Sequence, residues 1–451
     1  MKPTLFITLL CCLSLFTGTV FAGELSEDLK PDIPQTWTAE NAVAFAIVAN
    51  PDSFIAQKRI EEAQATAEMA KAADYPLINL SAEYAQTNTP MYSFGNILNQ
   101  GAFNNSIDFN DPGRTDNLNL KAMIAYRLYN GGRDQADMEA AESAIDMSRS
   151  DLTTVYQRLG FEVIKTFQAI VQAEEMVKVR HASLDAIKAA LGVAKARYDA
   201  GDLLRADLLN LELQVSVASE ELIQSEHNLE LTKRSFLNLL GLREGEVILS
   251  KEKETAQQIP EVISYTNREE LKRLQAMEQA SLAHLKKAEG AKLPTVDAFA
   301  SYQLDAGTVL DESGDSWMAG IKMDYNLFDG RRTSSAITQA KIQLQKIRGL
   351  VQKTELALNL EIQQAQLNYK QAKQRLAVTD KMVAVAEEGA RLSRVRFKEG
   401  VILASDLIDF ELHLTDAQAR HLAARARHKV AIANLRRVAG LSQFPGNTRV
   451  Q

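Results

Sequence analysis

The chain has 451 residues, 46% of them hydrophobic, with only 10 Pro and 22 Gly. This composition favours long helices over loops and leaves any sheet as a minor part. The net charge of −7 and the lack of a basic block argue against nucleic acid as a partner.

The first 22 residues predict a secretory signal that is cleaved from the mature chain. Lys2 precedes an apolar run over residues 4–16, and Val20 and Ala22 supply the small residues of a cleavage site. A membrane anchor is the alternative, but the run is shorter than the roughly 20 residues that a spanning helix needs. Both cysteines lie inside this run, so we expect no thiol or disulfide in the mature chain.

Two helices and a β-hairpin are predicted next. Thr38 is a typical cap for a helix to about residue 48, and Asn50-Pro51 restarts a helix that continues to about residue 73. Apolar and polar residues then alternate with a period of two on both sides of a loop rich in Gly, Asn, Asp and Ser, which predicts a hairpin over residues 76–128. We expect the loop to face solvent.

The second half of the chain repeats the first. Tyr126, Leu128, Gly131 and Arg133 recur 199 positions later, and a second hairpin is predicted over residues 294–327. The same offset relates a further set of matching pairs: Arg197/Arg396, Gly201/Gly400, Leu204/Leu403, Asp207/Asp406, Leu208/Leu407, Glu212/Glu411, Leu213/Leu412, Gly241/Gly440 and Leu242/Leu441. We therefore divide the chain into a signal peptide (1–22), a first repeat (23–260), and a second repeat with a C-terminal tail (261–451).

Each repeat also predicts one very long helix. Residues 133–197 and 332–396 contain no Pro and few Gly, and each would extend about 100 Å. Residues 38–74 and 206–240 are each about half as long, so two short helices stacked end to end would match one long helix. From residue 206 the apolar spacing is that of a heptad seam, which is typical of a coiled coil.

The strands have the length and pattern of strands that cross a bilayer. Alternation would direct apolar side chains to lipid and polar ones to a lumen. Four strands cannot close a barrel, so several copies of the chain would have to contribute. Tyr84, Tyr302 and Trp317 would lie near one membrane interface, and Tyr126, Tyr129, Tyr325 and Phe328 near the other. A soluble four-stranded sheet that covers helices is the alternative.

The duplicated segments resemble those of the TolC-like outer-membrane efflux proteins, the outer-membrane components of tripartite export systems. The resemblance rests on three motifs and covers nearly the whole mature chain. The motifs are the duplicated Tyr-x-Leu-aromatic-Asn/Asp-Gly-x-Arg segment, the duplicated Arg-aromatic-x-x-Gly-x-x-Leu-x-x-Asp-Leu-x-x-x-Glu-Leu segment, and residues 38–43 (TAENAV) before Asn50-Pro51. It implies a trimer with a 12-stranded β-barrel in the cell outer membrane and a 12-helix α-barrel through the periplasm.

The resemblance also implies a function and partners. It predicts a passive exit channel for efflux or type I secretion that docks to a periplasmic adaptor (membrane fusion) protein and an inner-membrane RND or ABC-type pump. The pattern does not distinguish drugs, metal ions and proteins as cargo. A secreted or periplasmic coiled-coil scaffold without channel activity is the alternative function.

The residues of the entrance are predicted from the same resemblance. Gly201 and Gly400 are typical helix-ending residues at turns between antiparallel helices. In the family such turns form the periplasmic tip, so Gly201, Leu204, Gly400 and Leu403 would lie at the adaptor-docking surface.

Three aspartates match gate positions of the family. They are Asp207, Asp406 and Asp409, and the spacing of three places the last two on one helical face. In a trimer they would place six carboxylates around one opening and favour cations. On residue chemistry alone, two Asp near a helix N-terminus are favourable charges on a solvated face. The arginine that bonds these aspartates in the best-known member of the family would fall at Ile402, with Leu203 at the equivalent position of the first repeat, although Arg205 is a candidate substitute.

No catalytic, cofactor or metal site is predicted. The six histidines are His181, His227, His284, His413, His421 and His428, and none forms a recognised metal-binding spacing. His421 and His428 occupy seam positions of the second repeat, which favours a packing role. Because the polar residues repeat as structural units and do not converge on a cleft, we expect no enzymatic activity.

Overall fold

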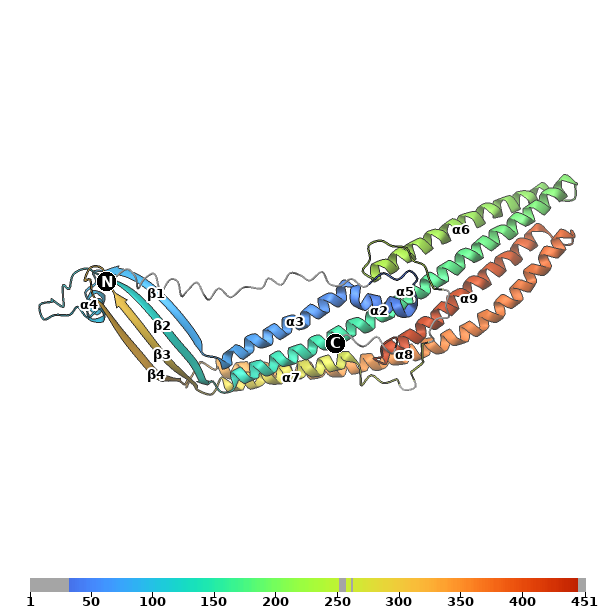
Figure 1. Ribbon diagram of the computed structural model, residues 1–451. Helices are drawn as coiled ribbons and strands as arrows, with labels where there is room; N and C mark the ends of the chain where they lie inside the picture. The colour runs from blue at the N-terminus through green and yellow to red at the C-terminus, as the bar shows by residue number, and fades with distance from the viewer. Residues whose placement is uncertain (1–31, 251–256, 261–262, 445–451) are drawn as a thin grey trace.

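The structure is a computed structural model that describes residues 32–250, 257–260 and 263–444. The predicted signal peptide (1–22) and residues 445–451 of the predicted tail lie outside the described residues. A β-sheet occupies one end of an elongated molecule, and paired helices extend from it to two helix-turn-helix tips at the other end (Figure 1).

The sheet has four strands in the order β1-β2-β3-β4, and every neighbouring pair is antiparallel. Their bounds are β1 (Leu77–Thr87), β2 (Thr115–Tyr129), β3 (Thr295–Ala306) and β4 (Ser313–Asp324). Both repeats thus contribute one hairpin to a single sheet, and β1 and β4 are its two open edges.

The strand register confirms the alternation that the sequence predicts. Leu80 pairs with Ala122, Ala122 with Tyr302, and Tyr302 with Trp317, so these side chains form one row on one face of the sheet. The next row consists of Ser81, Lys121, Gln303 and Ser316 and lies on the opposite face. One face of the sheet is therefore apolar and the other polar.

Two details of the hairpins differ from the prediction. β4 ends at Asp324, whose partner Thr295 follows a proline that has no N–H to extend the ladder, so Tyr325 and Leu327 lie beyond the strand. The long connection between β1 and β2 contains a helix, α4 (Pro90–Asn99), where the composition predicts only loop. Pro90 occupies its first turn.

The helices have the lengths expected from the sequence. The bounds are α2 (Ala39–Ala49), α3 (Pro51–Lys71), α5 (Arg133–Asp199), α6 (Arg205–Leu239), α7 (Glu269–Gly290), α8 (Arg332–Lys398) and α9 (Ala404–Val438), with a short 3-10 turn at Ala72–Asp74. α5 and α8 have 67 residues each, two more than predicted. Among the described residues, no helix is both long and apolar enough to cross a membrane.

The short helices do stack end to end, and the junction is duplicated. The Asn50 side chain, at the N-cap of α3, donates to the carbonyl of Leu239 at the end of α6 over 2.7 Å. Arg268, at the N-cap of α7, donates to the carbonyl of Val438 at the end of α9 over 3.1 Å. Each contact satisfies a carbonyl that a helix end leaves free.

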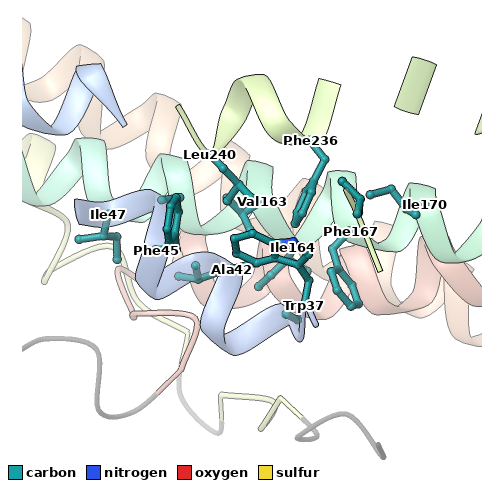
Figure 2. Packing of buried hydrophobic residues seen from close by; sticks show 14 of the residues in the cluster. Trp37, Ala42, Phe45, Ile47, Val163, Ile164, Phe167, Ile170, Phe236 and Leu240 are labelled. Carbon is teal, nitrogen blue, oxygen red and sulfur yellow. The ribbon is translucent and has the colours of Figure 1, made fainter. Parts of the chain in front are cut away.

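The largest core cluster lies where α2 packs between α5 and the end of α6. Figure 2 shows Trp37, Phe45, Phe167 and Phe236 converging there. The Trp37 ring packs edge-on against Phe45 and Phe236, with centroids 5.3 and 5.8 Å away. This cluster holds α2, α5, α6 and α9 together in the middle of the molecule, and the two helical hairpins, α5–α6 and α8–α9, extend from it side by side.

Candidate functional site at the helix-turn tips

The two tip turns have the same backbone structure. Gly201 and Gly400 follow α5 and α8 with φ of 86° and 78°, a conformation that glycine adopts without strain. The N–H of Asp202 donates to the carbonyl of Arg197 over 2.8 Å, and the N–H of Val401 donates to that of Arg396 over 2.9 Å. These are Schellman motifs, so the prediction that each glycine ends its helix is confirmed.

The two leucines of the predicted docking surface begin the returning helices. Leu204 and Leu403 are the N-cap residues of α6 and α9, and their relative exposures are 73% and 62%. Two large apolar side chains are therefore exposed at the tips, which is the kind of surface that protein partners cover.

The three predicted gate aspartates lie within the first two turns of α6 and α9. Asp406 accepts a hydrogen bond from the backbone N–H of Leu403 over 3.2 Å, and Asp409 is exposed one turn further along α9. Asp207 is half-buried on α6. Within the described part of the chain, none of the three makes an ion pair, so no cation of this chain neutralises their carboxylates.

Leu203 and Ile402, which stand where the resemblance predicts an arginine in one family member, are part of an apolar cluster. Leu203 and Ile402 pack against the buried tip residues Leu211, Phe397 and Leu407. Arg205, the candidate substitute, is exposed, and the described residues include no hydrogen bond or ion pair of its side chain. Within one chain, Arg205 does not take the place of that arginine.

A different arginine connects the two tips. Arg197 donates from Nη1 to the carbonyl of Phe397 over 3.2 Å and from Nη2 to the carbonyl of Asp202 over 3.3 Å. Its guanidinium also lies 5.6 Å from the centroid of the Phe397 ring, a cation–π contact. The duplicated motif contains Arg197, but its role follows only from the packing of one hairpin on the other, which no local pattern encodes.

Behind each tip an ion pair joins the two helices of a hairpin. Arg394 on α8 donates to both carboxylate oxygens of Glu411 on α9, over 2.5 and 2.7 Å. At the equivalent positions of the first repeat, Lys195 lies 3.9 Å from Glu212. The hydrogen bonds to Glu411 raise the pKa of Arg394 further, so this guanidinium is a permanent charge.

The histidines of the predicted seam pack as side chains of the helical bundle. His428 stacks on Tyr369 with ring centroids 5.7 Å apart. Over the described ranges of the chain, no group of three or more His, Cys, Asp or Glu side chains is placed to hold a metal ion.

This arrangement, a four-stranded sheet with one apolar face at the end of long paired helices, is the fold of solved outer-membrane channel proteins. The solved outer-membrane channel OprN superposes on 90% of this chain and 91% of its own with a TM-score of 0.77 at 18% identity. Outer membrane efflux protein BepC of Brucella suis is 24% identical over 343 residues, which are 74% of this chain and 68% of that protein. Protein CyaE of Bordetella pertussis is 21% identical over 408 residues, 88% of this chain and 81% of that protein.

The model of the outer membrane efflux protein family matches residues 45–242 and 264–441, and the chain belongs to this family. It is therefore an outer-membrane export protein with a helical extension into the periplasm, as the sequence motifs predict. The predicted fold class, mainly helical with a small β part, is confirmed.

Proposed function

We propose that three copies of this chain form a 12-stranded β-barrel and a 12-helix tunnel, and that the assembly is the passive exit channel of a tripartite efflux or type I secretion system. Its partners in this proposal are outer-membrane lipid, a periplasmic adaptor and an inner-membrane RND or ABC-type pump. The division into a signal peptide (1–22) and two repeats (23–260 and 261–451) belongs to the same proposal.

The main observation that supports the proposal is that the sheet has two open edges. β1 and β4 each have one unpaired row of backbone N–H and C=O groups, and both expose apolar side chains such as Ile78 and Ile321. Such edges are unfavourable in lipid unless another strand pairs with them. Pairing β1 of one copy with β4 of the next satisfies both edges and directs the continuous apolar face outward.

The residues at the tips support the proposed docking of an adaptor and the proposed position of the entrance. The exposed Leu204 and Leu403 are suited to contact with an adaptor protein, with Gly201 and Gly400 allowing close approach of its backbone. Asp207, Asp406 and Asp409 would surround the entrance. A coiled-coil scaffold without a channel accounts for the helices, but it leaves the apolar face and both edges of the sheet without a partner.

Localisation and assembly are tested first. We expect the chain to fractionate with the outer membrane and to migrate as a trimer in mild detergent, whereas a soluble monomer in periplasmic extracts would refute the architecture. An epitope near Asn104, in the connection between β1 and β2, should be labelled on intact cells. Protection from the label would show that the sheet has the opposite orientation.

The entrance is tested by charge removal. Asp406→Asn with Asp409→Asn removes six charges per trimer with little change in shape, so single channels should lose cation preference. The control, Glu61→Gln with Glu68→Gln on α3, removes the same number of exposed charges far from the tip and should leave selectivity unchanged. Unaltered selectivity of the aspartate variant in an intact trimer would place both side chains away from the pore.

A further inference from the structure

The duplication allows the two tip hairpins to be compared position by position. One row of residues along α9, here called a stripe, is buried, whereas the equivalent stripe on α6 is exposed. On α9 the stripe consists of Ala404, Ile408, Glu411 and Thr415, all buried, and Thr415 donates to the hydroxyl of Ser183 on α5 over 3.2 Å. The equivalent stripe on α6, 199 positions earlier, consists of Arg205, Leu209, Glu212 and Ser216, all exposed. Ile408 is 8% exposed and Leu209 52%.

The long helices show the same asymmetry. On α5, Ser183, Ala186, Val193 and Arg197 follow one another at helical spacing; Ser183 contacts Thr415 on α9, and Arg197 contacts the end of α8. Their equivalents on α8 are Met382, Val385, Leu392 and Arg396. Three of these four are large apolar residues on the surface, and Val385 is 74% exposed. Exposed apolar side chains aligned along one face of a helix are typical of an interface.

Among the described residues, the arginine contact at the tip is made by the first repeat and not by the second. Arg197 reaches the carbonyl and the ring of Phe397 within the chain. The equivalents of these two residues are Arg396 and Tyr198, and both are exposed. In the part of the chain that the structure describes, the Arg396 side chain makes no hydrogen bond, ion pair or ring contact. Arg396 is near the end of α8 and Tyr198 near the end of α5, and among the described residues no ring contact joins the two side chains.

We propose that the exposed stripe of α8 packs against the exposed stripe of α6 of a second copy, in the same geometry as α5 against α9. In this interface Arg396 donates to the carbonyl of Tyr198 of the neighbouring copy and stacks on its ring. The inference rests on the proposed trimer and adds to it the residues that join the copies at the tip. Glu212 becomes buried beside Lys195, as Glu411 is beside Arg394.

The contact has a functional consequence. A trimer contains three Arg197 contacts inside its chains and three Arg396 contacts between them. Because the three internal contacts join helices of one chain, a widening of the entrance between copies has to break the Arg396 contacts. In this proposal Arg396 holds the entrance closed, in a chain that has Ile402 and Leu203 where the resemblance predicts an arginine.

Paired cysteines test the geometry. Ser183→Cys with Thr415→Cys replaces two hydroxyls that lie 3.2 Å apart and should give a disulfide within one chain after oxidation with copper phenanthroline. Ser216→Cys with Met382→Cys is the equivalent pair across the proposed interface. It should give covalent dimers and trimers on a non-reducing gel, and each single-cysteine variant should stay monomeric. A native gel of the same samples reports the trimer separately.

The outcomes separate this inference from the proposed function. A native trimer in which the Ser183/Thr415 pair cross-links and the Ser216/Met382 pair does not would overturn the interface. Absence of any trimer would overturn the proposed function itself.

Conductance tests the role of Arg396. Arg396→Ala should raise the open probability of single channels roughly tenfold, since a cation–π contact and its hydrogen bond are lost. Arg197→Ala is the matched control and should change the open probability much less, because its contact does not cross between copies. Equal effects of the two variants, or no effect of Arg396→Ala, would refute the assignment.

Discussion

The ion pair between Arg394 and Glu411 offers a measurable test of how the second hairpin is held together. Glu411 is 4% exposed on α9 and lies against two other helices, while the Arg394 side chain is half exposed on α8. We predict that Arg394→Ala destabilises the tip, because it leaves a buried carboxylate without its charged donor.

The magnitude follows from the exposure of the two partners. Removing one member of a fully buried ion pair costs about 3–5 kcal/mol. Water reaches the outer half of Arg394, so we reduce this figure to about 2 kcal/mol, close to the value of one hydrogen bond to a charged group. Arg391 provides a matched control one turn earlier, where it makes a bidentate pair with Glu388 and both side chains are largely exposed. Arg391→Ala should have no measurable effect.

Hydrogen–deuterium exchange of the assembled protein is the suitable assay, since it reports local opening without complete unfolding. A loss of about 2 kcal/mol corresponds to exchange about 30-fold faster over the ends of α8 and α9. Adding Glu411→Gln to Arg394→Ala should restore part of the protection, because the neutral amide is less costly to bury. The reasoning is refuted if Arg391→Ala and Arg394→Ala accelerate exchange equally.

Two further predictions concern the middle of the molecule. Gly241 has a left-handed backbone conformation, and a Cβ added there would lie 2.6 Å from a backbone carbonyl oxygen, so Gly241→Ala should prevent stable assembly. Gly201→Ala is the control: Gly201 also has a positive φ but open space around it, so this variant should lower the thermal midpoint only slightly. Burial, with a smaller effect from Lys373, lowers the pKa of His428. The unfolded chain therefore binds the extra proton first, and stability present above about pH 6.5 is lost as pH falls through the folded pKa. His428→Phe should flatten this loss between pH 7.5 and 5.5 in thermal melts.

Local chemistry made the ends of the elements predictable. Thr38 and Asn50 cap α2 and α3 as their side chains suggest, and both tip glycines adopt positive φ. The period of two predicted the faces of the strands correctly because the residues in the middle of one face, such as Leu80, Ala122 and Trp317, are apolar. α4 was missed because its ten residues have no long apolar period, and it is held in place by contacts such as Gln100 with the backbone of Asp116.

The contacts between elements were not predictable from one sequence. Arg268 is almost fully buried between Glu270 and Glu361, yet its sequence context is that of an exposed helix start. Arg197 stands in a recognisable motif, but the partner that it reaches lies 200 positions away. Such contacts depend on which helices become neighbours, and the heptad spacing of α6 predicts that a helix covers it without predicting which one.

The duplication itself affects how an assembly of this chain can open. Two hairpins joined in one chain meet at a high effective concentration, whereas hairpins of different copies meet only when the copies assemble, which costs translational and rotational freedom. Equal contacts at Arg197 and Arg396 would therefore differ in net stability, and the weaker set would lie between copies. In the proposed trimer the entrance then opens as three rigid units of two hairpins each, without rearrangement inside any chain. A single mutation at position 396 changes three such contacts at once, so small changes at this residue should have large effects on gating.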